Sequence, residues 1–270
     1  MRRENKLAKA YIVLILLILY LPTALVVVYS FNESKSVSVW SGFTLDWYRG
    51  LAADRSLRER LVTSLRVGAL ASVLSAVLGT FGAVSLHGAK GLLATAARGF
   101  VYMPLLIPEI VLGVALMSTF SALRVPFGML TLVVSHSAFC IPYVFILVSI
   151  RMRLIDSAVY EAARDLGASR AKVFGTITLP LAAPAIGSGM LLAFAMSFDD
   201  VVVSFFVSGV KAQGQTLPPA IYSMVLKGIT PKVNALYTIV LLVIFTVVGA
   251  MQVVSYRRQA RNRAADMKSV

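Results

Sequence analysis

The sequence predicts an all-α integral membrane protein. Of its 270 residues, 58% are hydrophobic and only 14% are charged, and the mean hydropathy is +0.82. A soluble domain carries about 25% charged residues, so this composition suits a lipid environment. The apolar residues also gather into stretches of about 20, the length at which a helix crosses a bilayer. Six such stretches are expected as transmembrane helices, at about 10–31, 62–86, 99–122, 127–150, 181–206 and 234–256.

The first stretch follows a basic tail, residues 1–9. Its apolar core is longer than that of a secretory signal and no small-x-small cleavage site follows it, so we expect a retained membrane anchor. Residues 10–256 then form a single transmembrane domain, followed by a second basic tail, 257–270.

The distribution of lysine and arginine predicts the orientation. With the N-terminus inside, the cytoplasmic segments 1–9, 87–98, 151–180 and 257–270 hold 16 of the 26 Lys and Arg residues. This is the bias of the positive-inside rule, and it predicts that both termini are cytoplasmic. Contact with the membrane surface thus accounts for the net charge of +14 without a nucleic acid partner.

The outer loop 32–61 holds Trp40, Trp47 and Tyr48. These aromatic residues can belong to the interfacial belt of the membrane. They can equally face a partner on the outer surface.

The segment 151–180 is amphipathic and polar for so apolar a chain. Asp156 or Ser157 can cap a first helix, Gly167 can end it in the left-handed conformation, and Ser169 can cap a second. Apolar residues fall at helical spacing in both halves. They are Val159, Ala162, Ala163 and Leu166, then Val173, Phe174 and Ile177.

Three interpretations of this helix–glycine–helix segment remain. It can rest on lipid headgroups, or it can dock a soluble partner. A DNA-binding helix-turn-helix has the same layout, but the short tether between two spans disfavours it.

A resemblance favours the docking surface. EAARDLGASRAKVFGTITLP resembles the EAA loop of bacterial ABC-importer permeases, E-A-A, three residues, G, nine residues, I-x-L-P. Every fixed position matches, and we call residues 151–180 the EAA loop. In that family this loop is the coupling helix that inserts into a groove of the ATPase subunit. The resemblance therefore assigns coupling to Glu161, Ala162, Ala163, Gly167, Ala168, Ile177, Leu179 and Pro180.

Further segments resemble the spermidine/putrescine permeases of the PotC and PotI type. They are FNESKSVSVW, SHSAFCIPYV, SFDDVVVSFFVSG and TLPPAIYSMVLKGITPKVNAL. The resemblance implies the type I ABC importer permease fold and inward transport of polyamines across the bacterial inner membrane by alternating access. It also implies two ATPase subunits, a sister permease in a heterodimer, and a periplasmic substrate-binding protein. Because other solutes occur in this branch, a different small solute remains an alternative.

Three acids lie within the predicted spans: Glu109, Asp199 and Asp200. A charge in hydrocarbon is costly unless it faces water or a partner, so we expect them to line a substrate pathway, with helix packing as the alternative. Neighbouring residues on a helix point about 100° apart, so only one of the two aspartates can face the pathway squarely. The other is expected to bind a helix end or an arginine. For Glu109, Pro108 suggests a broken helix with amides to cap.

Aromatic rings can hold the ammonium groups of a cationic cargo, and Phe198 and Tyr143 are candidates. His136 and His87 are expected to pack or to sit at an interface, and Cys140 to act as a small buried hydrophobe. Arg66 is expected to extend its charge outward from the second span.

The chain has no G-x-x-x-x-G-K-[ST] phosphate loop, no nucleophile–base–acid set and no metal-ligand cluster. We therefore expect a non-catalytic subunit that binds no cofactor, with ATP and Mg²⁺ on the partner ATPase. An ion-coupled carrier would also hold midplane charges, but it needs no EAA loop. A membrane scaffold would leave the three acids unexplained.

Overall fold

The computed structural model describes residues 6–36, 38–243 and 245–246. It divides into two compact units, and each is described by itself. One unit comprises residues 1–54 and 223–270, and the other comprises Arg55–Tyr222. In the described ranges the regular structure is helical, apart from one isolated β-bridge between Asn32 and Phe43.

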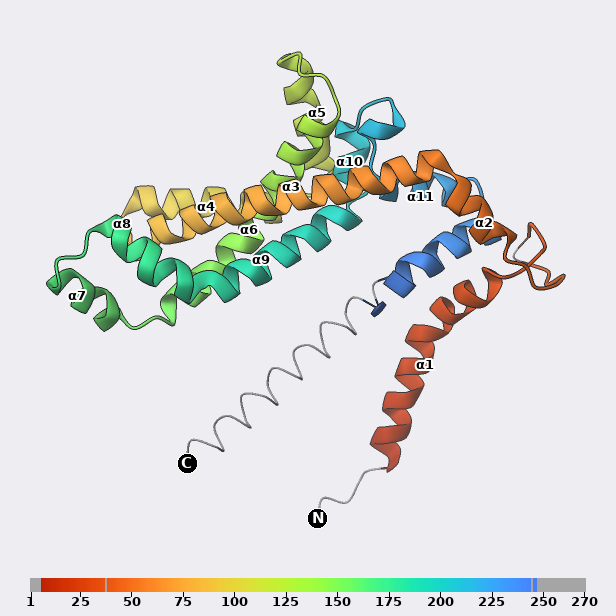
Figure 1. Ribbon diagram of the computed structural model, residues 1–270, viewed down its shortest axis with the longest axis horizontal. Helices are drawn as coiled ribbons and strands as arrows, with labels where there is room; N and C mark the ends of the chain where they lie inside the picture. The colour runs from red at the N-terminus through yellow and green to blue at the C-terminus, as the bar shows by residue number, and fades with distance from the viewer. Residues whose placement is uncertain (1–5, 37, 244, 247–270) are drawn as a thin grey trace. The chain divides into compact units, whose positions relative to one another are not determined.

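The unit Arg55–Tyr222 is built on three long helices that lie side by side: α3 (Arg55–Leu86), α6 (Met129–Arg153) and α9 (Leu179–Asp199) (Figure 1). The shorter elements are α4 (Leu92–Leu106), α5 (Glu109–Ala122), α7 (Ser157–Asp165), α8 (Arg170–Val173) and α10 (Val202–Val207). A π-helical turn, Phe174–Thr178, joins α8 to α9, and a 3-10 turn spans Ala212–Gly214. The last helix, α11 (Leu217–Leu226), begins in this unit and continues past its end at Tyr222.

Close contact between the three long helices depends on glycine. A Cβ atom on Gly79 of α3 would lie 2.9 Å from the Cβ of Val144 on α6, and one on Gly189 of α9 would lie 3.1 Å from the Cα of Val144. The backbones therefore approach from both sides of Val144. Around this point the core buries Ala83, Cys140, Val144, Phe145, Val148, Met152, Ala182 and Ala193. Cys140 is thus the buried small hydrophobe that was expected.

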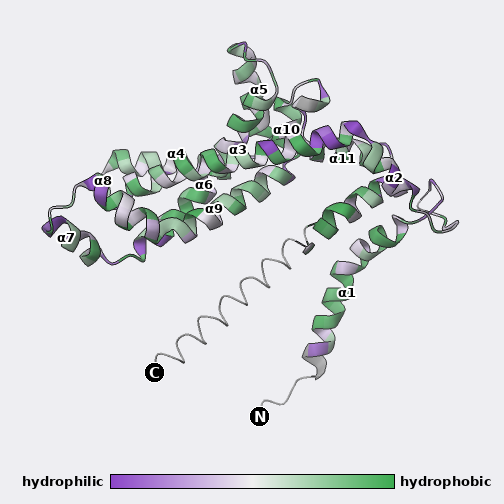
Figure 2. Cartoon of the chain, in the orientation of Figure 1, coloured by the Kyte–Doolittle hydropathy of each residue, from purple (hydrophilic) through white to green (hydrophobic). Residues whose placement is uncertain are grey.

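Four helices in the described ranges are long and apolar enough to cross a membrane: Lys9–Tyr29, Arg55–Leu86, Met129–Arg153 and Arg170–Asp199. α4 and α5 are apolar and long enough for a fifth span if the pair is counted as one, and they are bent by 107° at the break between them. Figure 2 shows the hydrophobic residues along α6 and α9 and the hydrophilic residues gathered at α7 and α8. The sixth predicted span begins in the helix Pro231–Val243, and residues 247–256 lie outside the described part. Both predicted tails lie largely outside it as well.

The span 99–122 is broken at Ile107 and Pro108, as the proline suggested, because a residue before proline is driven out of the helical region. Ile107 is extended, with φ −82° and ψ 129°. The span 181–206 was wrong as a single helix. It ends at Asp199, and after a two-residue break the chain resumes as α10. The other helices differ from the prediction mainly at their ends, most of all α3, which begins at Arg55 instead of residue 62.

In the other unit, α1 (Lys6–Tyr29) leads into a folded loop that contains α2 (Asp46–Ala53). The buried Asn32 organises this loop, since its side-chain amide donates to the carbonyl of Val39 at 2.7 Å. Trp47 donates its indole N–H to the carbonyl of Asn32 at 2.8 Å, and the hydroxyl of Tyr48 lies 2.6 Å from that of Ser30. Trp47 and Tyr48 therefore hold the loop together, a role that neither sequence interpretation included.

Candidate coupling surface and transport pathway

The EAA loop has the predicted helix–glycine–helix form. Asp156 caps α7 by accepting a hydrogen bond from the backbone N–H of Ala158 at 3.0 Å. Gly167 has a φ of +74°, and Ser169 caps α8 by accepting from the N–H of Lys172 at 3.3 Å. These three local features were predicted and are confirmed. They fix the turn between the two helices within a few residues of chain.

The apolar residues of the two halves of the EAA loop differ in burial. On α7 only Ala163 is buried, while Leu166 is 89% exposed. After α8, Val173 and Ile177 are half-buried, and Phe174 stacks on Phe81 of α3 at 5.7 Å between ring centroids. The apolar residues after Ser169 thus pack against the transmembrane helices. By contrast, Glu161 and Ala162 of α7 and Leu166 at its end are exposed at the surface.

The end of the EAA pattern forms the joint between α8 and α9. Ile177 lies in the π-helical turn, and Leu179 and Pro180 begin α9. Because proline has no N–H, the ordinary helical bond to the carbonyl of Thr176 cannot form at position 180. Arg151 of α6 supports this joint by donating to the carbonyl of Leu181 at 2.9 Å. The loop therefore continues into the transmembrane helix.

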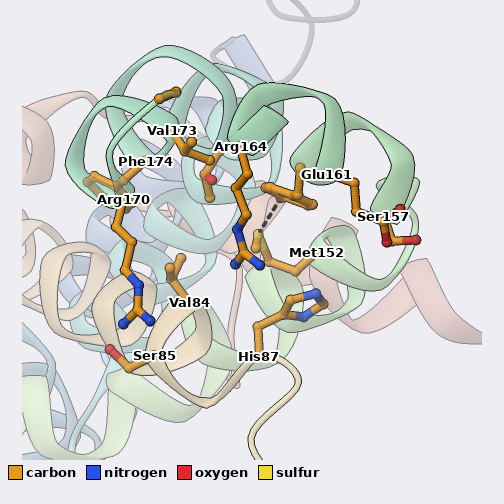
Figure 3. A pocket seen from close by; sticks show the side chains of 13 residues that line it. Val84, Ser85, His87, Met152, Ser157, Glu161, Arg164, Arg170, Val173 and Phe174 are labelled. Carbon is orange, nitrogen blue, oxygen red and sulfur yellow. Dashed lines mark hydrogen bonds between the residues drawn. The ribbon is translucent and has the colours of Figure 1, made fainter. Parts of the chain in front are cut away.

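A cleft of about 630 Å³ separates the EAA loop from the end of α3. Its loop side carries Glu161, Arg164 and Arg170, and its α3 side carries Val84, Ser85 and His87 (Figure 3). Both arginine side chains extend toward α3 in this view. His87, expected to pack or to lie at an interface, is exposed at this cleft. The cleft thus lies between a loop that carries charges of both signs and the end of α3.

The two intramembrane aspartates have separate environments. Asp199 is the last residue of α9 and is exposed. Asp200 is only 8% exposed, and its carboxylate accepts from the backbone N–H groups of Val203 at 3.2 Å and Ser204 at 2.6 Å. The expectation that one of the two acids binds a helix end is confirmed for Asp200, and the place of Asp199 on a substrate pathway stays a prediction. The helix end is that of α10.

The remaining pathway candidates lie near helix ends or on exposed faces. Glu109 is exposed in the first turn of α5, immediately after the break at Pro108. Phe198 is half-buried beside Asp199 and stacks on Phe194, with ring centroids 5.9 Å apart. Tyr143 is half-buried on α6.

His136 proves to pack in the interior, as expected, but its partners could not be read from the sequence. It is fully buried, and its two ring nitrogens bond the hydroxyls of Ser197 at 2.7 Å and Ser204 at 3.0 Å. The only sign of this cluster in the sequence is that polar residues occur in SHS and SFDDVVVS, within otherwise apolar runs. Arg66, expected to point outward, is exposed on α3.

The fold and the EAA loop define a permease of binding-protein-dependent transport. Residues 75–261 match the family described as the binding-protein-dependent transport system inner membrane component, and the chain belongs to this family. Members are inner-membrane, multi-pass transport subunits without catalytic activity of their own, and they work with a substrate-binding protein and an ATPase.

Curated relatives narrow the comparison. The putrescine transport system permease protein PotI of Escherichia coli K12 is 42% identical over 232 residues, covering 83% of this chain and 81% of PotI. The spermidine/putrescine transport system permease protein PotC of Haemophilus influenzae is 36% identical over 249 residues, covering 92% of this chain and 96% of PotC.

Solved structures agree on the fold. A bacterial ABC transporter that imports the acidic polysaccharide alginate superposes with a TM-score of 0.74 at 13% identity, over 93% of this chain and 98% of that one. A second structure is the bacterial alginate ABC transporter in complex with a periplasmic protein that holds an alginate pentasaccharide. It superposes with a TM-score of 0.69 at 17% identity, over 90% of this chain and 89% of that one. At these identities the likeness concerns architecture alone, and it is that of the ABC importer permeases.

Proposed function

We propose that this chain is the permease subunit of an ATP-driven importer that moves putrescine or spermidine into the cell. The observation that carries the cargo is the 36–42% identity to permeases named for these polyamines, over more than four-fifths of the chain. The exposed carboxylate of Asp199 supports it, because a polyamine is a cation and an acid at a helix end can meet it. A different small solute is the alternative.

In this proposal the EAA loop docks the ATPase, and two ATPase subunits bind the ATP and Mg²⁺ that this chain does not. The exposed Glu161 and Leu166 and the cleft behind them support that assignment, since they offer charge and apolar area together. A sister permease completes a heterodimer, and the cargo crosses a cavity between the two permeases by alternating access. A periplasmic binding protein docks on the outer loops. Both termini lie in the cytoplasm, as the lysine and arginine bias favours.

Substitutions in the EAA loop test the docking assignment. We expect Glu161→Ala and Gly167→Pro to leave the chain inserted while separating ATP hydrolysis from uptake. Glu161→Gln is the matched variant, because it removes the charge and keeps the shape. The measurement is uptake together with ATPase activity of the whole complex in vesicles. Normal uptake by the alanine and proline variants would overturn the assignment.

Uptake of labelled putrescine and spermidine tests the cargo. Cells that lack this gene receive the native chain, Asp199→Asn or Asp200→Asn. We expect the native chain to restore uptake and Asp199→Asn to abolish most of it at equal expression. If the native chain restores no polyamine uptake, the cargo is another solute.

A further inference from the structure

A buried polar cluster occupies the break between α9 and α10. Its members are His136 of α6, Ser197 of α9, Asp200 of the break and Ser204 of α10. All four are at most 8% exposed. Polar groups at such depth are retained only when they are hydrogen-bonded, and here each one is. The cluster is therefore a built feature of the interior.

His136 bonds one group on each side of the break. One ring nitrogen, Nδ1, lies 2.7 Å from the hydroxyl of Ser197, three residues before the break. The other, Nε2, lies 3.0 Å from the hydroxyl of Ser204 and 3.5 Å from a carboxylate oxygen of Asp200. A single imidazole thus connects the end of α9 to the start of α10.

The rest of α10 is held by the same helix. Thr131 of α6 donates its hydroxyl to the carbonyl of Val207, the last residue of α10, at 2.7 Å. α5 covers α10 closely, because a Cβ on Gly113 would lie 2.6 Å from the ring of Phe206. With both ends of α10 bonded to α6, the position of the break is set by α6.

The bond to Ser197 determines where Asp199 points. Each residue of an α-helix turns by about 100°, so a residue two places on points about 200° away, to the opposite side. Ser197 faces α6 and is buried, and Asp199 is exposed, as this geometry requires. Holding Ser197 inward therefore holds the carboxylate of Asp199 outward.

We propose that His136 is a positioning residue of the transport pathway, which fixes the α9–α10 break so that Asp199 presents its carboxylate to the cargo. The part that concerns cargo rests on the proposed function. Asp200 has a different place in this arrangement: its carboxylate is occupied by the amides of α10 and by the side of the imidazole ring.

A labelling experiment tests the positioning without reference to cargo. Cys140 is the only cysteine and is buried, so Cys140→Ser gives a background in which Asp199→Cys is the sole thiol. We expect a membrane-impermeant cationic thiol reagent to label position 199, and His136→Ala to slow that labelling about tenfold, the effect of losing a hydrogen bond of about 1.4 kcal/mol. The labelling is done on the purified chain in detergent, where the exposed Leu166→Cys of the EAA loop serves as the control and should label equally with either residue at 136. Unchanged labelling at 199 would overturn the proposal.

Uptake by the whole complex supplies the second readout. We expect His136→Ala to lower uptake per ATP hydrolysed about tenfold in the native background but less than about twofold with Asp199→Asn, because residues that act through one another are not additive. His136→Asn, whose amide can occupy the place of Nδ1, should recover most of the uptake. Equal losses in both backgrounds, or no recovery with asparagine, would show a general structural role. If labelling responds while the native chain imports no polyamine, the cargo is wrong and the positioning stands.

Discussion

Gly79→Ala tests the contact between α3 and α6. The added methyl carbon would lie 2.9 Å from the Cβ of Val144 and 3.1 Å from the backbone carbonyl oxygen of Ile141 and the backbone N of Phe145. Backbone atoms cannot rotate aside, so the two helices must separate. Overpacking of this kind costs about 1–3 kcal/mol, and the better helix propensity of alanine returns about 0.5–1 kcal/mol. We expect a net loss of about 1–2 kcal/mol.

Thermal unfolding of the purified chain in detergent measures this loss. For a domain of this size, about 1–2 kcal/mol lowers the Tm by about 2–8 °C. Gly187→Ala is the matched control, because it is also a helix-interior glycine and its Cβ would meet nothing within 4 Å. That variant should be as stable as the native chain or slightly more stable. If the Tm of Gly79→Ala equals that of Gly187→Ala, the close approach of α3 and α6 is refuted.

Three smaller changes test the turn and the caps. Gly167→Ala places a side chain at φ +74°, which costs about 1–2 kcal/mol, and it should lower uptake per ATP hydrolysed. Gly175→Ala, whose Cβ would also lie in open space, is the control and should leave uptake unchanged. Ser169→Ala removes the α8 cap, worth about 1 kcal/mol, and should speed amide exchange in the turn that follows by about fivefold. Thr131→Val keeps the shape but loses the bond to the end of α10, so it should lower the Tm of the purified chain, while Thr176→Val at the exposed surface should change it less.

The features that the sequence predicts well are those decided by neighbouring residues. Asp156 and Ser169 cap helices by accepting from an N–H two or three residues away, and Gly167 needs only its own freedom at positive φ. Pro108 likewise predicts the break before α5, because proline disfavours the helical conformation of the residue before it, Ile107. Each of these depends on chemistry within one turn of the chain.

The features that it misses depend on distant partners or on water. The break at Asp200 depends on His136, whose bonds connect residues 61 and 68 positions apart, and no periodicity records such a pairing. Helix ends were also misplaced, since hydropathy marks where a helix leaves the lipid and not where its hydrogen bonds stop. α3 accordingly begins at Arg55 instead of residue 62, and the added turns contain arginines that hydropathy alone excludes from a span.

The EAA loop and Asp199, the proposed pathway acid, lie at opposite ends of one helical segment. Arg170–Asp199 is continuous over 30 residues, about 45 Å at 1.5 Å per residue, which exceeds a hydrocarbon core of about 30 Å. Its hydrogen-bond pattern changes at the π-helical turn Phe174–Thr178, near the loop end, and from there α9 runs to Asp199. If ATPase subunits move α8 as proposed, α9 carries that movement to the end of the helix. There His136 bonds the last turn to α6, so a movement of the far end of α9 either takes α6 and α10 with it or breaks these hydrogen bonds.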